Sequence, residues 1–319
     1  MSTLTTISLG GLSATVDSAG AQLLSLSLRG REYLWQRDPR WWGKTSPVLF
    51  PGVGFPPHEV QRSVAGPCRI GKHGFARDHE FELVDVDEYA ASLTYELTDS
   101  PETRAVYPYP FKLQLVYTLD APASLTQTFR VENTGTEPMP FSVGGHPAFN
   151  VPVLNEPEDE RFEDYDLHFS RSWTYRSPKT NARGLMERDD TFPVVEDSDV
   201  MPLTRACFDY DTVVLKDVPD HTITMTGRKS GRGVRLDFPG FDFVGVWSAQ
   251  PDAPFVAIEP WTGHAGYTDE DDVLEHRDNV TILQPGEVDE RSFKITLLAP
   301  HEDEAQVIVH GHALTSLPL

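Results

Sequence analysis

Residues 111–119 read FKLQLVYTL, and an apolar side chain stands at every second position of this stretch. The apolar set comprises Phe111, Leu113, Leu115, Tyr117 and Leu119. Alternate side chains of a β-strand point to opposite faces, so the pattern predicts a strand with one face in a core and one in water. Strands of this kind are typical of antiparallel sheets.

The same alternation recurs outward from this stretch in both directions. It is found in residues 12–16, 24–28, 125–131, 234–238 and 293–297. The 26 prolines and 23 glycines suit many short strands and turns, and good helical stripes are almost absent. We therefore predict an all-β protein with one large antiparallel β-sandwich domain over residues 1–319, its long loops gathered around a cleft. The stretches 155–164 and 179–190 are expected to be surface excursions between strands.

Composition limits the classes of function. The 319 residues include 27 Lys and Arg against 49 Asp and Glu, a net charge of −22. Such a charge repels nucleic acid and anionic membrane surfaces, so neither is expected as a partner. The two cysteines are too few for a disulfide framework, and no stretch approaches the roughly 20 apolar residues of a membrane helix. The N-terminus lacks the features of a signal peptide, and a cytoplasmic location is expected.

Three segments carry residues suited to acid–base chemistry. Glu259 follows an apolar run in FVAIEPWTGH (255–264), where a carboxylate is costly unless it has a partner or a task. His73 and Arg77 lie in GKHGFARD (71–78), and His146 lies in FSVGGHPAFN (141–150). Each has an ordinary alternative. Glu259 could cap a strand or pair with an arginine, and His146 could satisfy backbone groups at a corner. His73 could be an ordinary loop histidine, with Arg77 and Asp78 in a structural ion pair.

Asp211 and Trp247 are further candidates for the site, and the histidines are candidates for a metal site. Asp211 is suited to anchoring substrate hydroxyls or to a turn, and Trp247 is suited to a pocket wall or, more often on a strand, to a core. The 11 histidines include His58, His73 and His79, and a pair at His310 and His312, but none of these spacings is that of a strong metal site. No metal and no organic cofactor is therefore expected.

At these residues the chain resembles the aldose 1-epimerase (mutarotase) family, and especially its LacX-like branch. The matching motifs run in order along nearly the whole chain, and the resemblance implies a β-sandwich with a sugar in a cleft on one sheet. They are GAQL (20–23), EYLWQ (32–36), SPVLFP (46–51), HGFARD (73–78), GGHPAFN (144–150), IEPWTG (258–263) and LQPGE (283–287).

The resemblance implies roles for four residues. Glu259 would be the general base and His146 the general acid, His73 would bind beside the ring oxygen, and Asp211 would hold ring hydroxyls. Proximity of the first two would favour both charges, lowering the pKa of the carboxyl and raising that of the imidazole. The implied partner is a small carbohydrate, an aldohexose, with the protein a monomer or homodimer.

One position departs from the family. Where a substrate-contacting arginine commonly follows the LFPxVG motif, this chain has Phe55. With only Arg77 carried by a motif, neutral hexoses are expected in preference to hexose 6-phosphates. The alternatives are a non-catalytic sugar-binding protein, a hexose-6-phosphate epimerase and, last, a polysaccharide-cleaving enzyme, which would need a second carboxylate beside Glu259.

Overall fold

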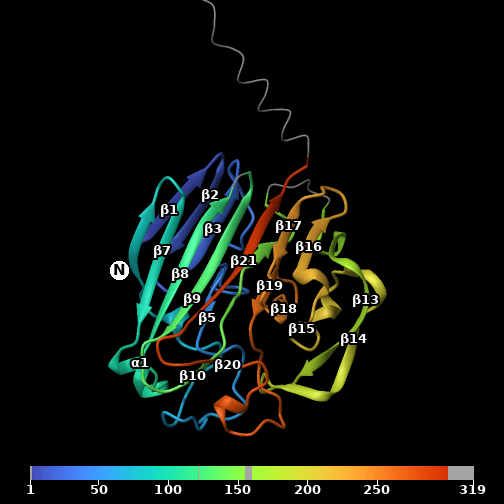
Figure 1. Cartoon of the computed structure of the whole chain (residues 1–319). Helices are drawn as coiled ribbons and strands as arrows, with labels where there is room; N and C mark the ends of the chain where they lie inside the picture. Colours follow the sequence, from blue (N-terminus) through green and yellow to red (C-terminus); the bar gives the residue numbers. More distant parts are fainter. Residues whose placement is uncertain (1, 121, 155–159, 301–319) are drawn as a thin grey trace, which may run out of the picture.

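The computed structural model describes residues 2–120, 122–154 and 160–300, and these are mostly β-strands (Figure 1). The largest sheet has nine strands, with β21 between its two halves. In spatial order they are β14 (Met186–Pro202), β13 (Tyr165–Thr180), β16 (Thr222–Gly227), β17 (Gly233–Asp237), β21 (Val288–Leu298), β9 (Ser124–Asn133), β8 (Phe111–Asp120), β7 (Ser92–Thr98) and β6 (Glu82–Asp87).

A six-stranded sheet carries the candidate site. Its order is β15 (Val213–Lys216), β18 (Phe243–Trp247), β19 (Phe255–Trp261), β11 (Gly144–Gly145) and β5 (Val48–Leu49), with β12 (Ala148–Asn150) also paired to β19. A four-stranded sheet holds β1 (Leu4–Leu9), β2 (Leu12–Asp17), β3 (Gln22–Leu28) and β4 (Arg31–Glu32), and a two-stranded one holds β10 (Met139–Phe141) and β20 (Thr281–Leu283). The pairs between these strands are antiparallel.

Helical structure is slight in the described residues. The one α-helix is α1 (Pro101–Val106), and the short 3₁₀ turns are η1 (Ala76–Asp78), η2 (Phe162–Asp164), η3 (Arg205–Phe208), η4 (Pro219–His221) and η5 (Leu274–His276). No helix in the described ranges is long and apolar enough to cross a membrane. The prediction of an all-β antiparallel architecture is confirmed.

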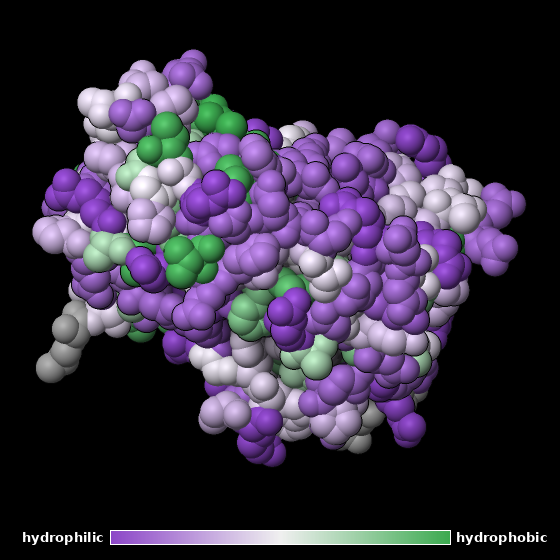
Figure 2. Space-filling model, turned by 90° about the horizontal axis from the view of Figure 1, so that it is seen from below, coloured by the Kyte–Doolittle hydropathy of each residue, from purple (hydrophilic) through white to green (hydrophobic). Residues whose placement is uncertain are grey.

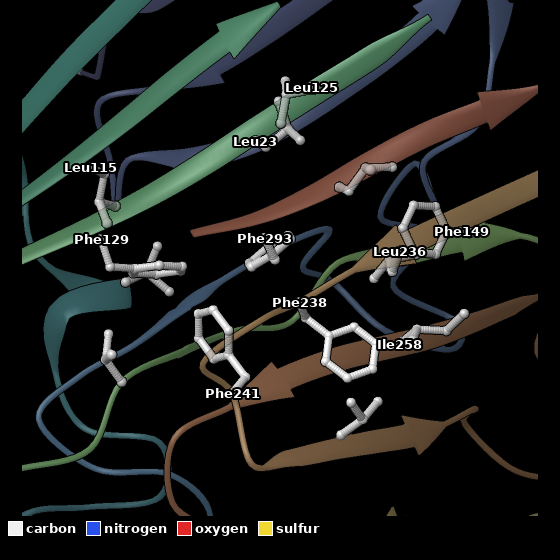
Figure 3. Close-up of a cluster of buried hydrophobic side chains, with 14 of the residues drawn as sticks. Leu23, Leu115, Leu125, Phe129, Phe149, Leu236, Phe238, Phe241, Ile258 and Phe293 are labelled. Carbon is white, nitrogen blue, oxygen red and sulfur yellow. The ribbon is translucent and has the colours of Figure 1, made fainter. Parts of the chain in front are cut away.

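The apolar stripes meet in one core between the sheets. Along β8, buried and half-buried positions alternate from Phe111 to Asp120, as the sequence pattern predicted. Figure 3 shows Leu115, Phe129 and Phe293 of the nine-stranded sheet in the same cluster as Ile258 of β19. Each such side chain contributes roughly 1.5–3 kcal/mol when it is fully buried. The outer surface seen in Figure 2 is mainly hydrophilic, with scattered hydrophobic residues.

The alternation of β19 decides which side chains face the site. Val256 and Ile258 belong to the core between the sheets, so Glu259 and Trp261 lie on the opposite face of the six-stranded sheet. Gly245 stands opposite Glu259 on β18, and a Cβ there would lie 2.3 Å from the Trp261 indole. The absence of a side chain at Gly245 makes room for this ring.

The stretch 179–190 is not a surface excursion, and that prediction was wrong. β13 continues to Thr180 and β14 begins at Met186, so the stretch is the tip of a long β-hairpin. The turn closes with Gly184 at a φ of 75°, a conformation that glycine adopts without strain. Of the stretch 155–164, residues 155–159 lie outside the described residues and the remainder ends in η2.

Candidate active site

The six residues predicted for the site line one cavity of about 240 Å³ on the outward face of the six-stranded sheet. They are Glu259, His146, His73, Arg77, Asp211 and Trp247. Glu259 and Trp247 come from the adjacent strands β19 and β18, and His146 follows directly after β11. The sheet thus places an acid–base pair on rigid backbone, where its geometry is reproducible.

Glu259 and His146 form a buried dyad. The Nε2 atom of His146 lies 3.2 Å from Oε2 of Glu259, and the two residues are only 6% and 1% exposed. The His146 backbone N–H donates to the carbonyl of Pro47, and Trp42 stacks on the imidazole with the ring centroids 4.7 Å apart. His146 is therefore held both through its backbone and through one face of its ring.

The expected direction of both pKa shifts was wrong. Burial raises the pKa of Glu259 well above its ordinary value, although the positive charge of Lys72 opposes this. Burial also lowers the pKa of His146 to about 3. Desolvation of each charge outweighs their mutual attraction, so burial favours a neutral carboxyl beside a neutral imidazole. A neutral pair and an ion pair hold the same number of protons and differ only in where one proton lies.

His73 is fixed as a hydrogen-bond donor to the cavity. Its Nδ1 accepts from the backbone N–H of Gly54 at 3.1 Å, and burial holds its pKa well below the ordinary value. The neutral ring must then carry its proton on Nε2. Its ring stands edge-on to that of His146, with the centroids 5.7 Å apart.

Asp211 and Trp247 are joined on the cavity wall. The indole Nε1–H of Trp247 donates to Oδ1 of Asp211 at 2.9 Å. Asp211 has a φ of 69°, so the turn alternative is also present, and the turn presents the carboxylate to the cavity. Trp247 lines the cavity and also packs against a small buried cluster that includes Phe255, so both alternatives offered by the sequence are present.

Arg77 lines the cavity but is engaged by its own loop. It donates to the carbonyl of Lys72 at 2.8 Å, and its Nε lies 3.6 Å from Oδ2 of Asp78. The ion pair between Arg77 and Asp78, which the sequence offered as the ordinary alternative for Arg77, is thus present.

Several wall residues were not predicted as site residues. They are Trp42, Gly54, Phe55, Lys72, Thr180, Thr212, Val214, Gly184, Trp261 and Ala265. The Lys72 ammonium lies 5.1 Å from the centre of the Phe55 ring, and a Cβ on Gly184 would lie 2.2 Å from that ring. Lys72 thus places a positive charge beside Phe55. Two of them gave a signal in the sequence: Trp261 follows Glu259 as an aromatic face, and Phe55 follows the LFPxVG motif.

One group of potential metal ligands occurs in the described residues. The ligand atoms of His264, Glu270 and Asp278 lie within 4.8 Å of one another. Arg277 pairs with Glu270 at 3.3 Å, and Arg188 pairs with Asp278 at 3.2 Å. The two arginines already balance the carboxylates, so the group fits a structural ion-pair cluster better than a cation site. His310 and His312 lie outside the described residues.

Known proteins with similar sequences and folds match nearly the whole chain. The model of the family described as aldose 1-epimerase matches residues 3–296. Protein LacX of Lactococcus lactis subsp. lactis is 36% identical over 295 residues, which cover 90% of this chain and 97% of that protein.

Two solved structures share the fold. A galactose mutarotase related enzyme from Lactobacillus acidophilus has a TM-score of 0.86 and 28% identity, covering 93% of this chain and 98% of that chain. A galactose mutarotase-like protein from Lactobacillus casei has a TM-score of 0.84 and 27% identity, covering 93% and 100%.

Proposed function

Because the chain belongs to the aldose 1-epimerase family, a family of isomerases, we propose that it interconverts the α and β anomers of an aldohexose. The observation that carries the proposal is the buried dyad, with 3.2 Å between His146 Nε2 and Glu259 Oε2, facing a cavity of about 240 Å³. A cavity of this kind, with aromatic walls and a few convergent polar groups, suits a small neutral ring.

The reaction needs one proton acceptor and one proton donor. Ionised Glu259 takes the proton of the anomeric hydroxyl while protonated His146 gives a proton to the ring oxygen. The bond between C1 and the ring oxygen breaks, C1 becomes a free aldehyde, and rotation about C1–C2 exposes its other face. Reclosure returns both protons, so the enzyme ends as it began.

Substrate binding sets the protonation state in this proposal. The productive ion pair differs from the neutral pair of the empty cavity only by transfer of one proton from Glu259 to His146. Sugar hydroxyls that hydrogen-bond to the Glu259 carboxylate stabilise its charged form. His73, as an Nε2–H donor, supports the ring oxygen, and Asp211 accepts from ring hydroxyls.

The test is mutarotation of freshly dissolved α-glucose and α-galactose, followed by polarimetry. Purified protein should accelerate the approach to equilibrium over buffer, and no acceleration with any common aldose or its 6-phosphate would refute the proposal. The sugar-binding alternative is distinguished by Glu259→Gln: wild type and variant would then bind sugar equally and neither would turn it over. Both cysteines are free, which suits the cytoplasmic location that we also propose.

A further inference from the structure

A second cavity adjoins the sugar site. It has a volume of about 380 Å³, and its walls include Phe55, Arg69, Lys72, Arg183 and Leu185. Phe55 and Lys72 also line the first cavity, so these two side chains form the wall between the two spaces. A molecule that fills the first cavity therefore needs to extend only past Phe55 and Lys72 to reach the second.

Three exposed cations line the second cavity. Arg69 and Lys72 come from the loop before His73, and Arg183 comes from the tip of the β13–β14 hairpin. Within residues 2–120, 122–154 and 160–300, none of the three side chains takes part in an ion pair. One carboxylate, the exposed Glu59, lies on the same wall.

Acidic residues outnumber basic ones by 49 to 27, and some exposed arginines pair with carboxylates, as Arg62 does with Asp272 and Arg228 with Asp166. The three cations of the second cavity have no such partner within the described residues, so the cavity has an excess of positive charge. An anionic ligand would balance that charge.

The charge of Lys72 also reaches the dyad. Its ammonium acts to lower the pKa of both Glu259 and His146. Lys72 thus lines both the cavity of the reacting groups and the cavity of the two arginines. A ring seated beside the dyad would direct one substituent toward Lys72 and into the second cavity.

We propose that the second cavity is an anion subsite that holds the phosphoryl group of a hexose phosphate while its ring occupies the first cavity. This rests on the proposed anomerase function and names its substrate class. Arginine guanidinium groups form bidentate hydrogen bonds with phosphate oxygens, whereas a neutral sugar carries no charge to balance three cations. The prediction of neutral hexoses rested on Arg77 as the one cation carried by a motif, with Arg69 or Lys72 as cations that it could recruit across the loop. It did not include Arg183, whose segment was expected to be a surface excursion.

The experiment compares glucose with glucose 6-phosphate at equal concentrations by NMR exchange spectroscopy, with the spontaneous rate of each sugar subtracted. The phosphate should have a kcat/KM at least tenfold higher, mainly through a lower KM, because the phosphoryl group binds away from the reacting carbon. Arg183→Gln and Arg69→Gln should each raise KM for glucose 6-phosphate about tenfold and change the rate with glucose less than twofold. Arg130→Gln, at an exposed arginine on β9, is the matched control.

The outcomes separate the subsite from the reaction. Turnover of glucose with no preference for its phosphate overturns the subsite and leaves the proposed function standing. Turnover of neither sugar refutes the proposed function, and calorimetry then decides the subsite: glucose 6-phosphate must bind wild type at least tenfold more tightly than Arg183→Gln. Binding of inorganic phosphate alone, without tighter binding of the sugar phosphate, also overturns it.

Discussion

Two glutamates with little-exposed side chains lie close in sequence, and their nearest charged or titratable partners differ. Glu270 lies 3.3 Å from Arg277, a largely buried guanidinium that also donates to the carbonyl of His264. Glu259 has no arginine partner and faces a neutral histidine across 3.2 Å, at the wall of a cavity. Burial raises the pKa of both carboxyls, and only at Glu270 does a paired guanidinium oppose it. A carboxylate that serves structure is balanced within the protein, whereas Glu259 leaves its charge to be balanced by a ligand.

Replacing the uncompensated carboxylate should have the largest effect on activity. Glu259→Gln keeps the shape of the side chain and removes the proton acceptor, so kcat should fall by about 10²–10⁴-fold. The unfolding free energy should match or exceed that of wild type, because a costly buried carboxyl is lost. Polarimetry and urea unfolding measure the two quantities. A variant that retains wild-type kcat would remove Glu259 from the mechanism.

Replacing the compensated carboxylate should affect stability instead. Glu270→Leu leaves the Arg277 guanidinium buried without its partner, and breaking such a pair costs roughly 3–5 kcal/mol. The variant should unfold at lower urea concentration, while the fraction that remains folded turns sugar over at the wild-type rate. If Glu270→Leu were as stable as wild type, the ion pair would not be the compensation that we describe.

Only part of the contrast between Glu259 and Glu270 could be predicted from the sequence. The strands could be predicted because alternation survives from residue to residue, as along β8, and Glu259 could be found because Pro260 and Trp261 mark the end of its strand. Lys72 reaches the cavity from a loop whose path depends on the whole fold, so no local pattern reveals it. The hairpin tip was missed because register shifts interrupt the β13–β14 pairing and blur the alternation.

The pKa directions were missed for a related reason. Sequence reasoning could place His146 and Glu259 near each other, and proximity alone favours two charges. The degree to which the pair is desolvated depends on the rings that surround it. Trp42 stacks on His146, and Trp247 stands edge-on to the same imidazole. Burial is a property of the assembled cavity, and here it reverses the sign of both shifts.

The pH profile tests this reversal. Since burial lowers the pKa of His146 to about 3, the dyad takes up no second proton between pH 7 and pH 5. The value of kcat/KM for glucose should therefore hold within about twofold over that interval and fall only on the alkaline side, as the dyad loses its one proton. Circular dichroism at each pH confirms that the protein stays folded. An acid limb centred near pH 6.5 would indicate an ordinary histidine.

The smallest expected effect concerns His264, beside the compensated glutamate. His264 is 2% exposed, and burial lowers its pKa to about 4, with Arg277 acting in the same direction and Asp278 against it. An unfolded histidine has a pKa of about 6.5, so below that pH the unfolded chain binds a proton that the folded protein does not. The stability that neutral His264 contributes is thus fully present above pH 6.5 and is lost as pH falls toward 4.

His264→Gln lacks this dependence, so the unfolding free energy of wild type relative to the variant should drop by up to about 1.4 kcal/mol per pH unit between pH 6 and pH 4.5. His73 and His146 remain in both proteins and cancel in the difference. Urea unfolding at matched ionic strength measures it, and a difference that stays constant with pH would show that His264 is not buried in its neutral form.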